Sequence, residues 1–319
     1  MVNSKIIGIG SYLPSKILTN FDLEKMVDTS DEWIVERTGI KERRIADESE
    51  LTSDLALKAS LDAIKNANID KNDIELIIVA TTTPDRTLPS TATILQGKLE
   101  IPETCSSFDI QAVCGGFVYA LTIANSFIKS GQVKTALVVG AETISRIVDW
   151  KDRNTCILFG DGAGAVVLQA TNEDKGIISC DLHSDGKYLD ILKSDSGVSI
   201  DQKAGFLYME GREVFKLAIH KMVNSVIDNF KKANLDISSL KYLVPHQANK
   251  RIIDGIGKKL GLSEEQVILT VQNHANTSSA SVPLALDTAV KSNKFKDNDI
   301  IVLEALGAGL VWGSIIIKW

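Results

Sequence analysis

Short runs of consecutive apolar residues alternate along the chain with longer segments of helical periodicity. Runs such as 77–80 and 315–317 contain no polar residue, which is typical of internal strands in a sheet that is covered on both faces. The segment 115–129 is apolar on nearly every side, so we expect a helix buried in the middle of the protein. The pattern as a whole predicts an α/β fold with central sheets between helical layers.

Part of this pattern occurs twice. Residues 65–79 (KNANIDKNDIELIIV) and 231–245 (KKANLDISSLKYLVP) share Lys, Ala, Asn and Asp 166 positions apart, followed by matching apolar positions. Both segments read as a helix end, a polar turn and a strand. A second repeated pattern lies at the end of each half, where one predicted strand precedes another after a turn that contains glycine. The pairs of segments are 134–142 with 160–169 and 298–309 with 310–318. We therefore expect two pseudo-symmetric halves, 1–171 and 172–319, with a ligand cleft at the pseudo-twofold axis between them.

Composition narrows the class of protein. Thirty-five basic and 41 acidic side chains give a net charge of −6, which makes general nucleic-acid binding a poor hypothesis. We expect no membrane span, because no apolar run approaches the required length, and no signal peptide, because the N-terminus lacks its pattern. The cysteines form no C-x-x-C pair, so we expect neither a metal site nor a disulfide framework but a cytoplasmic protein. They are Cys105, Cys114, Cys156 and Cys180.

Cys114 is the candidate nucleophile. It follows a predicted strand at 107–112 and precedes the apolar helix 115–129, which Ser130 and Gly131 would end. A thiol at a helix N-terminus meets the positive end of the helix dipole, which favours the thiolate. The two glycines after it would let a substrate approach closely. The alternative is that Cys114 is a small buried apolar residue, and its local sequence leaves both interpretations open.

His246 and Asn276 are the candidate partners of that cysteine. His246 lies in VPHQAN directly after a predicted strand, at the position that the repeat makes equivalent to Ala80. The carboxyl ends of strands are where α/β proteins place their chemistry. Asn276 lies in NHANTSSAS ahead of an apolar helix. A lone histidine is more often a core residue than a catalyst, and a Cys–His pair would also suit a cysteine hydrolase.

Two further segments suggest binding surfaces. Thr29-Ser30-Asp31-Glu32 fits a capping box that opens a helix ending at Gly39, and this helix places Trp33 and Arg37 on one face. Such a pair can hold a purine by stacking and cation–π contact, or can be an ordinary surface pair. Residues 249–260 predict an amphipathic helix with a basic face, which indicates an acidic partner or simply a solvated surface. The apolar side comprises Ile252, Ile253, Ile256 and Leu260, and the basic side Arg251, Lys258 and Lys259.

Five segments together resemble β-ketoacyl-[acyl-carrier-protein] synthase III, a family of condensing enzymes in the thiolase superfamily. The resemblance spans nearly the whole chain in the family's order, and it implies the thiolase-like five-layered αβαβα fold with two pseudo-symmetric halves. The segments are TSDEWIVERTGIKER (29–43), DIQAVCGGFVYAL (109–121), FGDGAGAVVL (159–168), LVPHQANKRI (243–252) and HANTSSASVPLAL (274–286).

The resemblance implies a decarboxylative Claisen condensation that starts type II fatty-acid synthesis. Cys114 would take the acyl group from acetyl-CoA or another short acyl-CoA, with the backbone N–H groups of Cys114 and Ala308 as the oxyanion hole. Malonyl-acyl-carrier protein would then lose carbon dioxide, and His246 and Asn276 would stabilise the resulting enolate. The product would be 3-oxoacyl-acyl-carrier protein, and the reaction would need no metal or other cofactor.

The same resemblance assigns the binding residues. CoA would contact Thr29, Trp33, Arg37, Arg153 and Asn249. The carrier protein would dock on Arg251, with Lys216, Lys258 and Lys259 beside it. The family forms homodimers, in which Leu88 would reach the partner's acyl pocket.

Two positions depart from the family pattern. The terminal loop is Leu306-Gly307-Ala308-Gly309, where the family usually has three glycines, and a positive φ at Ala308 would strain it. Leu88 replaces a frequent phenylalanine, so the pocket could admit a longer or branched acyl chain. Three other functions remain alternatives: an acyl-CoA-condensing enzyme of polyketide type, a cysteine thioesterase or peptidase, and a silent binding module.

Overall fold

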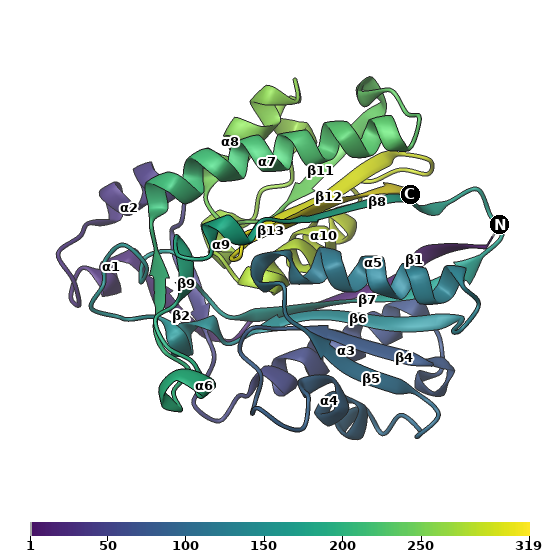
Figure 1. Cartoon of the computed structure of the whole chain (residues 1–319), viewed down its shortest axis with the longest axis horizontal. Coiled ribbons are helices and arrows are strands. Elements are labelled where there is room, and N and C mark those ends of the chain that lie inside the picture. Colours follow the sequence, from purple (N-terminus) through teal and green to yellow (C-terminus); the bar gives the residue numbers. More distant parts are fainter. Residues whose placement is uncertain (1) are drawn as a thin grey trace.

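The first half of the chain forms a five-stranded sheet. The computed structural model describes residues 2–319, and the strand order in this sheet is β1-β7-β6-β4-β5 (Figure 1). Strand β4 runs parallel to β5 and β6, whereas β7 is antiparallel to β6 and β1. The strands are β1 (Asn3–Tyr12), β4 (Leu76–Ala80), β5 (Ser106–Ile110), β6 (Thr135–Glu142) and β7 (Gly162–Thr171).

The second half forms a four-stranded sheet of the same design. Its order is β11-β12-β13-β8, with β11 parallel to β12 and the other pairs antiparallel. This arrangement repeats β4-β6-β7-β1 of the first sheet. The strands are β8 (Gly176–Ser184), β11 (Leu240–Pro245), β12 (Ile300–Gly307) and β13 (Val311–Lys318).

Helices separate and cover the two sheets. Two helices, α5 (Gly116–Lys129) and α10 (Ser281–Lys291), lie between the sheets in the middle of the molecule (Figure 1). The outer face of the first sheet carries α3 (Thr52–Ala67) and α4 (Thr91–Leu99), and that of the second carries α7 (Gly211–Lys232) and α8 (Lys250–Lys259). The result is the five-layered αβαβα arrangement that was expected.

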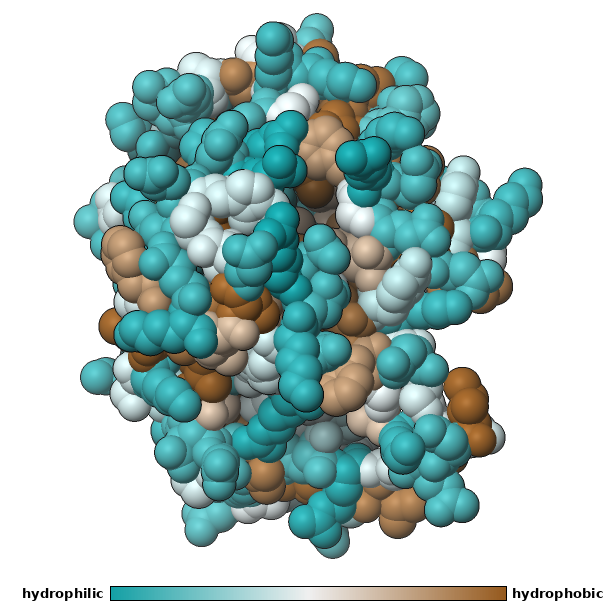
Figure 2. All heavy atoms as spheres, turned by 90° about the vertical axis from the view of Figure 1, so that its left-hand side faces the viewer, coloured by the Kyte–Doolittle hydropathy of each residue, from teal (hydrophilic) through white to brown (hydrophobic). Residues whose placement is uncertain are grey.

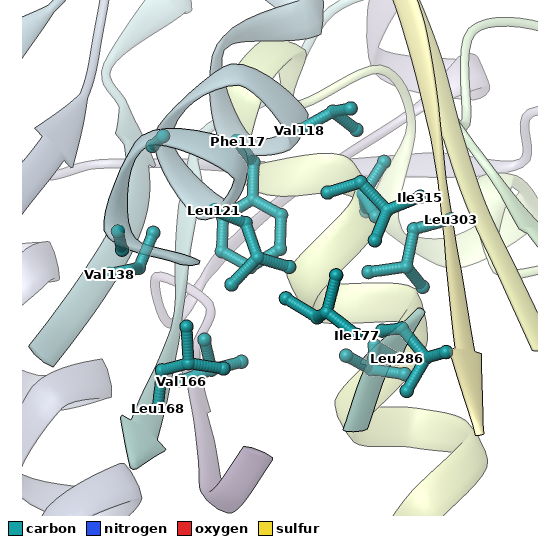
Figure 3. Close-up of a cluster of buried hydrophobic side chains, with 14 of the residues drawn as sticks. Phe117, Val118, Leu121, Val138, Val166, Leu168, Ile177, Leu286, Leu303 and Ile315 are labelled. Carbon is teal, nitrogen blue, oxygen red and sulfur yellow. The ribbon is translucent and has the colours of Figure 1, made fainter. Parts of the chain in front are cut away.

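The central core joins the two halves through the apolar helix that the sequence predicts. Phe117 and Leu121 of α5 lie between Val138 of the first sheet and Leu303 and Ile315 of the second (Figure 3). Neighbouring residues of β12 point the other way, into the core beneath α7 and α8. Both faces of the strand are therefore buried, which explains why the apolar runs show no polar alternation.

The sequence repeat is confirmed in backbone detail. Asn68 and Asn234, which are 166 positions apart, end α3 and the α7 segment with φ angles of 53° and 54°. The side chains of Asp70 and Asp236 then each cap a 3-10 turn by accepting the backbone N–H two residues ahead. Each turn leads into the strand that the repeat predicts.

Several of the remaining elements, among them α1, α2, β2, β9 and α6, gather at one end of the sheets (Figure 1). Figure 2 shows this face, where hydrophobic residues lie in hollows between polar side chains. None of the helices within residues 2–319 is both long enough and apolar enough for a bilayer span. The remaining elements are β2 (Lys16–Thr19), α1 (Asn20–Leu23), α2 (Asp31–Thr38), β3 (Glu42–Ile45), η1 (Lys71–Asp73), η2 (Val113–Gly115), η3 (Ile144–Ile147), η4 (Gly186–Tyr188), β9 (Leu192–Ser194), α6 (Val198–Asp201), β10 (Leu207–Met209), η5 (Ile237–Ser239), η6 (Glu264–Gln266), α9 (Val271–His274) and η7 (Ser278–Ala280).

Candidate active site

One cavity of about 260 Å³ brings the predicted chemistry together. Cys114, His246 and Asn276 all line it, as do Ala308 and Asn249. These residues come from both halves of the chain, and the first three are nearly inaccessible to solvent. The rest of the wall is mainly apolar and includes Ile144, Phe159, Leu207, Met209, Phe215 and Met222. Such a lining suits a thioester with an apolar acyl chain.

Cys114 lies in η2 immediately before α5, as the sequence predicts. The preceding Val113 has a φ of 46°, a costly conformation for a β-branched residue, so the surrounding structure holds this turn in place. The expected thiolate is not favoured here. Burial raises the pKa of Cys114 to about 12, and the nearby charge of Glu142 also raises it, while the neighbouring Ser278 hydroxyl lowers it. The resting group is therefore a thiol.

Neither of the two glycines after Cys114 lines the cavity, so the structure gives no support to the expectation that they let a substrate approach. A Cβ on Gly116 would lie 3.0 Å from Cβ of Ala80, so this glycine allows close packing, whereas a Cβ on Gly115 would make ordinary contact with Val311 at 3.6 Å. The tightest backbone contact at the nucleophile is made by Gly307, where a Cβ would lie 2.7 Å from the Cys114 nitrogen.

Gly307 brings the terminal loop beside the nucleophile. The next residue, Ala308, lines the same cavity as Cys114. The strain expected at Ala308 does not occur, because the positive φ of this loop falls on Gly309, at 130°. An alanine can therefore occupy the position without a backbone penalty.

His246 is held from both sides. Its backbone N–H donates to the carbonyl of Glu304 across 2.8 Å, and its Nδ1 lies 2.5 Å from Ser281 Oγ at the start of α10. Ser281 Oγ also accepts the backbone N–H of Gln247, and donation of its own hydrogen to Nδ1 would place the ring hydrogen on Nε2. We assign this tautomer to His246. Burial lowers the pKa of His246 to about 3, so the ring is a neutral donor.

Asn276 is fixed equally firmly. Its backbone forms an isolated bridge with Phe159, and its Oδ1 accepts the backbone N–H of Ser278 across 2.9 Å. Because a backbone N–H can only donate, the oxygen of the amide must face it, and the NH₂ group is left for the cavity.

Sequence reasoning missed the residues that position these groups. Gln247 is completely buried and joins the end of β11 to the loop before α9 through four hydrogen bonds. Ser281 orients His246, and Ser278 contacts Cys114. Glu142, at the end of β6, lies behind Ser278. For Gln247, Ser278 and Ser281 the single signal available was their place near predicted site residues. Glu142 gave no such signal, because its contacts join distant parts of the chain.

Trp33 is stacked with two arginines. The guanidinium carbons of Arg37 and Arg153 lie 4.7 and 4.6 Å from the ring centroid. The helix that carries Trp33 ends at Gly39 as predicted, but its N-cap is Ser30, which accepts from Trp33 N–H, so the proposed Thr29 capping box is wrong. Thr29 instead has a buried hydroxyl with no hydrogen-bond partner. These residues lie outside the lining of the cavity.

The basic helix α8 begins beside the cavity. Asn249 caps it, accepting from Arg251 N–H, and donates to the carbonyl of Arg37. The Arg251 guanidinium lies 5.5 Å from the ring of Phe215, which lines the cavity. The isoleucines of α8 are buried, as predicted. Lys258 and Lys259 are exposed at its last turn, and Lys216 is exposed on α7, where it pairs with Glu213.

Leu88 does not line the cavity of its own chain. Its side chain is 77% exposed. Across residues 2–319, no cluster of three or more His, Cys, Asp or Glu side chains has an arrangement that could hold a metal.

Comparison with known proteins gives a consistent result. Residues 108–186 match the family 3-oxoacyl-[acyl-carrier-protein (ACP)] synthase III, and residues 230–319 match its C-terminal family. A β-ketoacyl-[acyl-carrier-protein] synthase III of Ehrlichia canis (strain Jake) is 54% identical over the full length of both chains. The crystal structure of 3-oxoacyl-[acyl-carrier-protein] synthase III from Aquifex aeolicus VF5 superposes with a TM-score of 0.95, at 46% identity over 99% of this chain and 100% of that one. The priming β-ketosynthase from the R1128 polyketide pathway has a TM-score of 0.93 and 34% identity, covering 99% of this chain and 96% of its own.

Proposed function

Because this chain belongs to the β-ketoacyl-[acyl-carrier-protein] synthase III family, we propose that it is the condensing enzyme that starts type II fatty-acid synthesis. It joins acetyl-CoA, or another short acyl-CoA, to malonyl-acyl-carrier protein, and releases CoA, carbon dioxide and 3-oxoacyl-acyl-carrier protein. The observation that carries this proposal is the convergence of Cys114, His246 and Asn276 on one apolar cavity.

Acylation comes first. Cys114 attacks the carbonyl carbon of the acyl-CoA, and the backbone N–H groups of Cys114 and Ala308 stabilise the oxyanion of the tetrahedral intermediate. Collapse of the intermediate expels CoA and leaves the acyl group on sulfur as a thioester. The close passage of Gly307 along the Cys114 nitrogen supports this pairing of N–H groups.

Decarboxylation and condensation follow. Loss of carbon dioxide from the malonyl group places negative charge on its thioester oxygen, where His246 Nε2–H and the Asn276 amide donate. Both donors are neutral and already oriented, so they need no reorganisation when the charge develops. The enolate carbon then attacks the acyl-enzyme, and Cys114 leaves. Decarboxylation drives bond formation, so we propose no metal or redox cofactor.

The acyl-CoA is held by the surface around α2. Its adenine stacks on Trp33 in place of one of the two arginines that cover the ring, and the displaced guanidinium of Arg37 or Arg153 can then cover the purine. The hydroxyl of Thr29 is buried without a hydrogen-bond partner, so a shift of its side chain would let it donate to the nucleotide. Asn249, at the rim of the cavity, lines the path of the pantetheine.

The carrier protein docks on the basic surface of α7 and α8. Arg251 is its main contact, supported by Lys216, Lys258 and Lys259. The contact between Arg251 and Phe215 supports this placement, because it puts the docking surface next to the cavity that the carrier's prosthetic arm must reach.

We further propose a cytoplasmic homodimer of two-domain chains. The exposed side chain of Leu88 would enter the partner's acyl pocket, and the unpaired edge strand β5 lies on the same half of the molecule. The division into 1–171 and 172–319 is supported by the sheets, since all five strands of one precede residue 172 and all four strands of the other follow it.

The decisive assay supplies acetyl-CoA and malonyl-carrier protein and analyses the carrier by mass spectrometry. The proposal predicts 3-oxoacyl-carrier protein, dependent on both substrates and abolished by Cys114→Ser. Release of free acid without a carbon–carbon bond would instead identify a thioesterase, and equal turnover with malonyl-CoA would favour the polyketide-type enzyme.

A further inference from the structure

A buried carboxylate lies behind the nucleophile without a role in the chemistry described so far. Glu142 is fully inaccessible to solvent at the end of β6. No ion pair within residues 2–319 includes it, and it accepts hydrogen bonds instead. The donors are the backbone N–H groups of Thr82 and Thr83 and the hydroxyls of Thr81, Thr83, Ser278 and Ser279.

These hydrogen-bond donors favour the ionised form of the Glu142 carboxyl group. Backbone N–H groups of Thr82 and Thr83 point at the carboxyl oxygens from 3.1 to 3.2 Å and cannot accept a proton from them. The hydroxyls complete the shell of a negatively charged group. Burial nevertheless raises the pKa of Glu142, so its affinity for a proton exceeds that of an exposed carboxylate. Glu142 is therefore suited to accept a proton at neutral pH.

Ser278 connects this carboxylate to the reacting sulfur. Its hydroxyl donates its single hydrogen to Glu142 Oε1 across 3.1 Å, and its oxygen lies beside the Cys114 thiol in the same cavity, where it can accept the S–H proton. The residue has a φ of 50°, and its N–H is held by Asn276 Oδ1, so the side chain is fixed by the same turn that places the catalytic amide. Ser278 also lines the cavity.

Acylation needs a proton acceptor, because Cys114 rests as a thiol. His246 is a poor one, since burial lowers its pKa to about 3 and its Nδ1 is occupied by Ser281. The nearest acceptor that the described contacts connect to the sulfur is Glu142. The same negative charge disfavours a resting thiolate, so the proton is retained until an acyl donor is attacked.

We propose that Ser278 and Glu142 form a proton relay for the acylation half-reaction. This inference rests on the proposed function, because it assigns a path to the proton that Cys114 must lose. As sulfur forms its bond to the acyl carbon, the S–H proton passes to Ser278 Oγ, and the hydroxyl proton of Ser278 passes to Glu142 Oε1. When CoA leaves as a thiolate, Ser278 passes its hydroxyl proton directly to the departing sulfur and Glu142 returns its proton to Ser278, so that CoA departs as the thiol. Ser278 touches the reacting atom, whereas Glu142 acts through it.

The neighbouring serine provides a matched control. Ser279 is also buried, and its single hydroxyl hydrogen is shared between Glu142 Oε1 at 3.0 Å and the carbonyl of Ala80 at 2.8 Å. It is not among the groups that affect the pKa of the thiol. Ser279→Ala therefore removes a comparable contact to Glu142 without breaking the path. Glu142→Gln keeps the shape of the side chain but turns one end of it from acceptor to donor.

The test measures the single-turnover rate of acylation by acetyl-CoA, using quenched-flow and intact-protein mass. We expect Ser278→Ala and Glu142→Gln to slow acylation by about 100-fold or more, and Ser279→Ala by less than about threefold. Discharge of an already formed acetyl-enzyme by malonyl-carrier protein should change much less than acylation in all three. The solvent isotope effect on acylation should indicate two moving protons in the wild type and should be lost in Ser278→Ala. Circular dichroism and thermal melting establish that each variant is folded.

The possible outcomes distinguish failure of the proton relay from failure of the proposed function. Equal slowing by Ser278→Ala and Ser279→Ala would show that Glu142 merely holds the turn together, and wild-type acylation in Glu142→Gln would exclude it as the acceptor. Either result leaves the condensing function intact. If the wild type itself gains no acetyl group, the proposed function fails instead.

Discussion

The backbone N–H of Ser278 donates to Asn276 Oδ1 across 2.9 Å. This bond decides which end of the amide faces the cavity, so Asn276 presents its NH₂ group there as the donor that the proposed decarboxylation step needs. The same serine reaches Cys114 with its hydroxyl. A single turn thus orients groups for both half-reactions.

Asn276→Ala should separate the two half-reactions. Acylation of Cys114 by acetyl-CoA should proceed at nearly the wild-type rate, because the amide has no part in it. Decarboxylation of malonyl-carrier protein should slow by about 100- to 1000-fold, the usual cost of losing one oxyanion donor. Quenched-flow measurement of the acetyl-enzyme gives the rate of acylation, and carbon dioxide release from malonyl-carrier protein gives the rate of decarboxylation. Asn273→Ala, an exposed neighbour, is the control, and an equal loss in both steps would contradict the assigned role.

Trp33→Ala should weaken the binding of acetyl-CoA, which carries an adenine, but not of acyl donors that lack the nucleotide. Stacking on the ring should be worth about 1–2 kcal/mol, so we expect KM for acetyl-CoA to rise roughly tenfold with little change in kcat. Acetyl-pantetheine lacks the nucleotide and serves as the control substrate. Its kinetics should be the same in the variant and the wild type. Similar losses with both donors would mean that Trp33 supports the fold of α2 rather than the nucleotide.

Arg251→Glu should affect the carrier protein and not the acyl donor. We expect KM for malonyl-carrier protein to rise about tenfold at low ionic strength, and the difference from wild type to shrink as salt screens the interaction. Acylation by acetyl-CoA should be unchanged. Lys129→Glu makes the same change of charge at the exposed end of α5 and should leave both steps alone. The docking assignment fails if only the acetyl-CoA step suffers.

Glu304 makes stability depend on pH. Both of its carboxyl oxygens are buried without a hydrogen-bond partner, and burial raises its pKa from 4.5 to about 8. Because the folded state holds the proton more tightly than the unfolded state, its contribution is fully present below the ordinary pKa. It is lost as the pH rises from the ordinary pKa of 4.5 to about 8, and the whole contribution is on the order of 5 kcal/mol.

Glu304→Gln should remove this dependence. We expect the variant to lose less stability than the wild type when chemical unfolding is compared at about pH 5 and about pH 8. Glu103→Gln removes an equivalent charge from an exposed site and should retain the wild-type dependence. Parallel curves for the wild type and Glu304→Gln would show that Glu304 is ionised or satisfied in the folded protein.

Local sequence patterns predicted the framework well. The paired Asn68 and Asn234, each in a left-handed conformation at a helix end, show that the repeat records real backbone geometry. The setting of Cys114 was predicted for the same reason, because a strand, two glycines and an apolar helix are neighbours in the chain. Periodicity is a local signal, and these features are local.

Effects that depend on distant residues were not predictable in this way. The helix N-terminus at Cys114 suggested a thiolate, but burial by the surrounding layers outweighs that local field. Glu142 and Ser278 are 136 residues apart, and nothing in either segment indicates that they meet. The cap at Ser30 rather than Thr29 shows the usual uncertainty of a helix boundary.

The most direct test of the central claim is the intact mass of the protein after mixing with acetyl-CoA and then with malonyl-carrier protein. The account predicts a gain of one acetyl group, located on Cys114 by peptide mapping, and its disappearance as acetoacetyl-carrier protein forms. An unmodified mass with every short acyl-CoA, or an acetyl group that is released only as acetate, would contradict it.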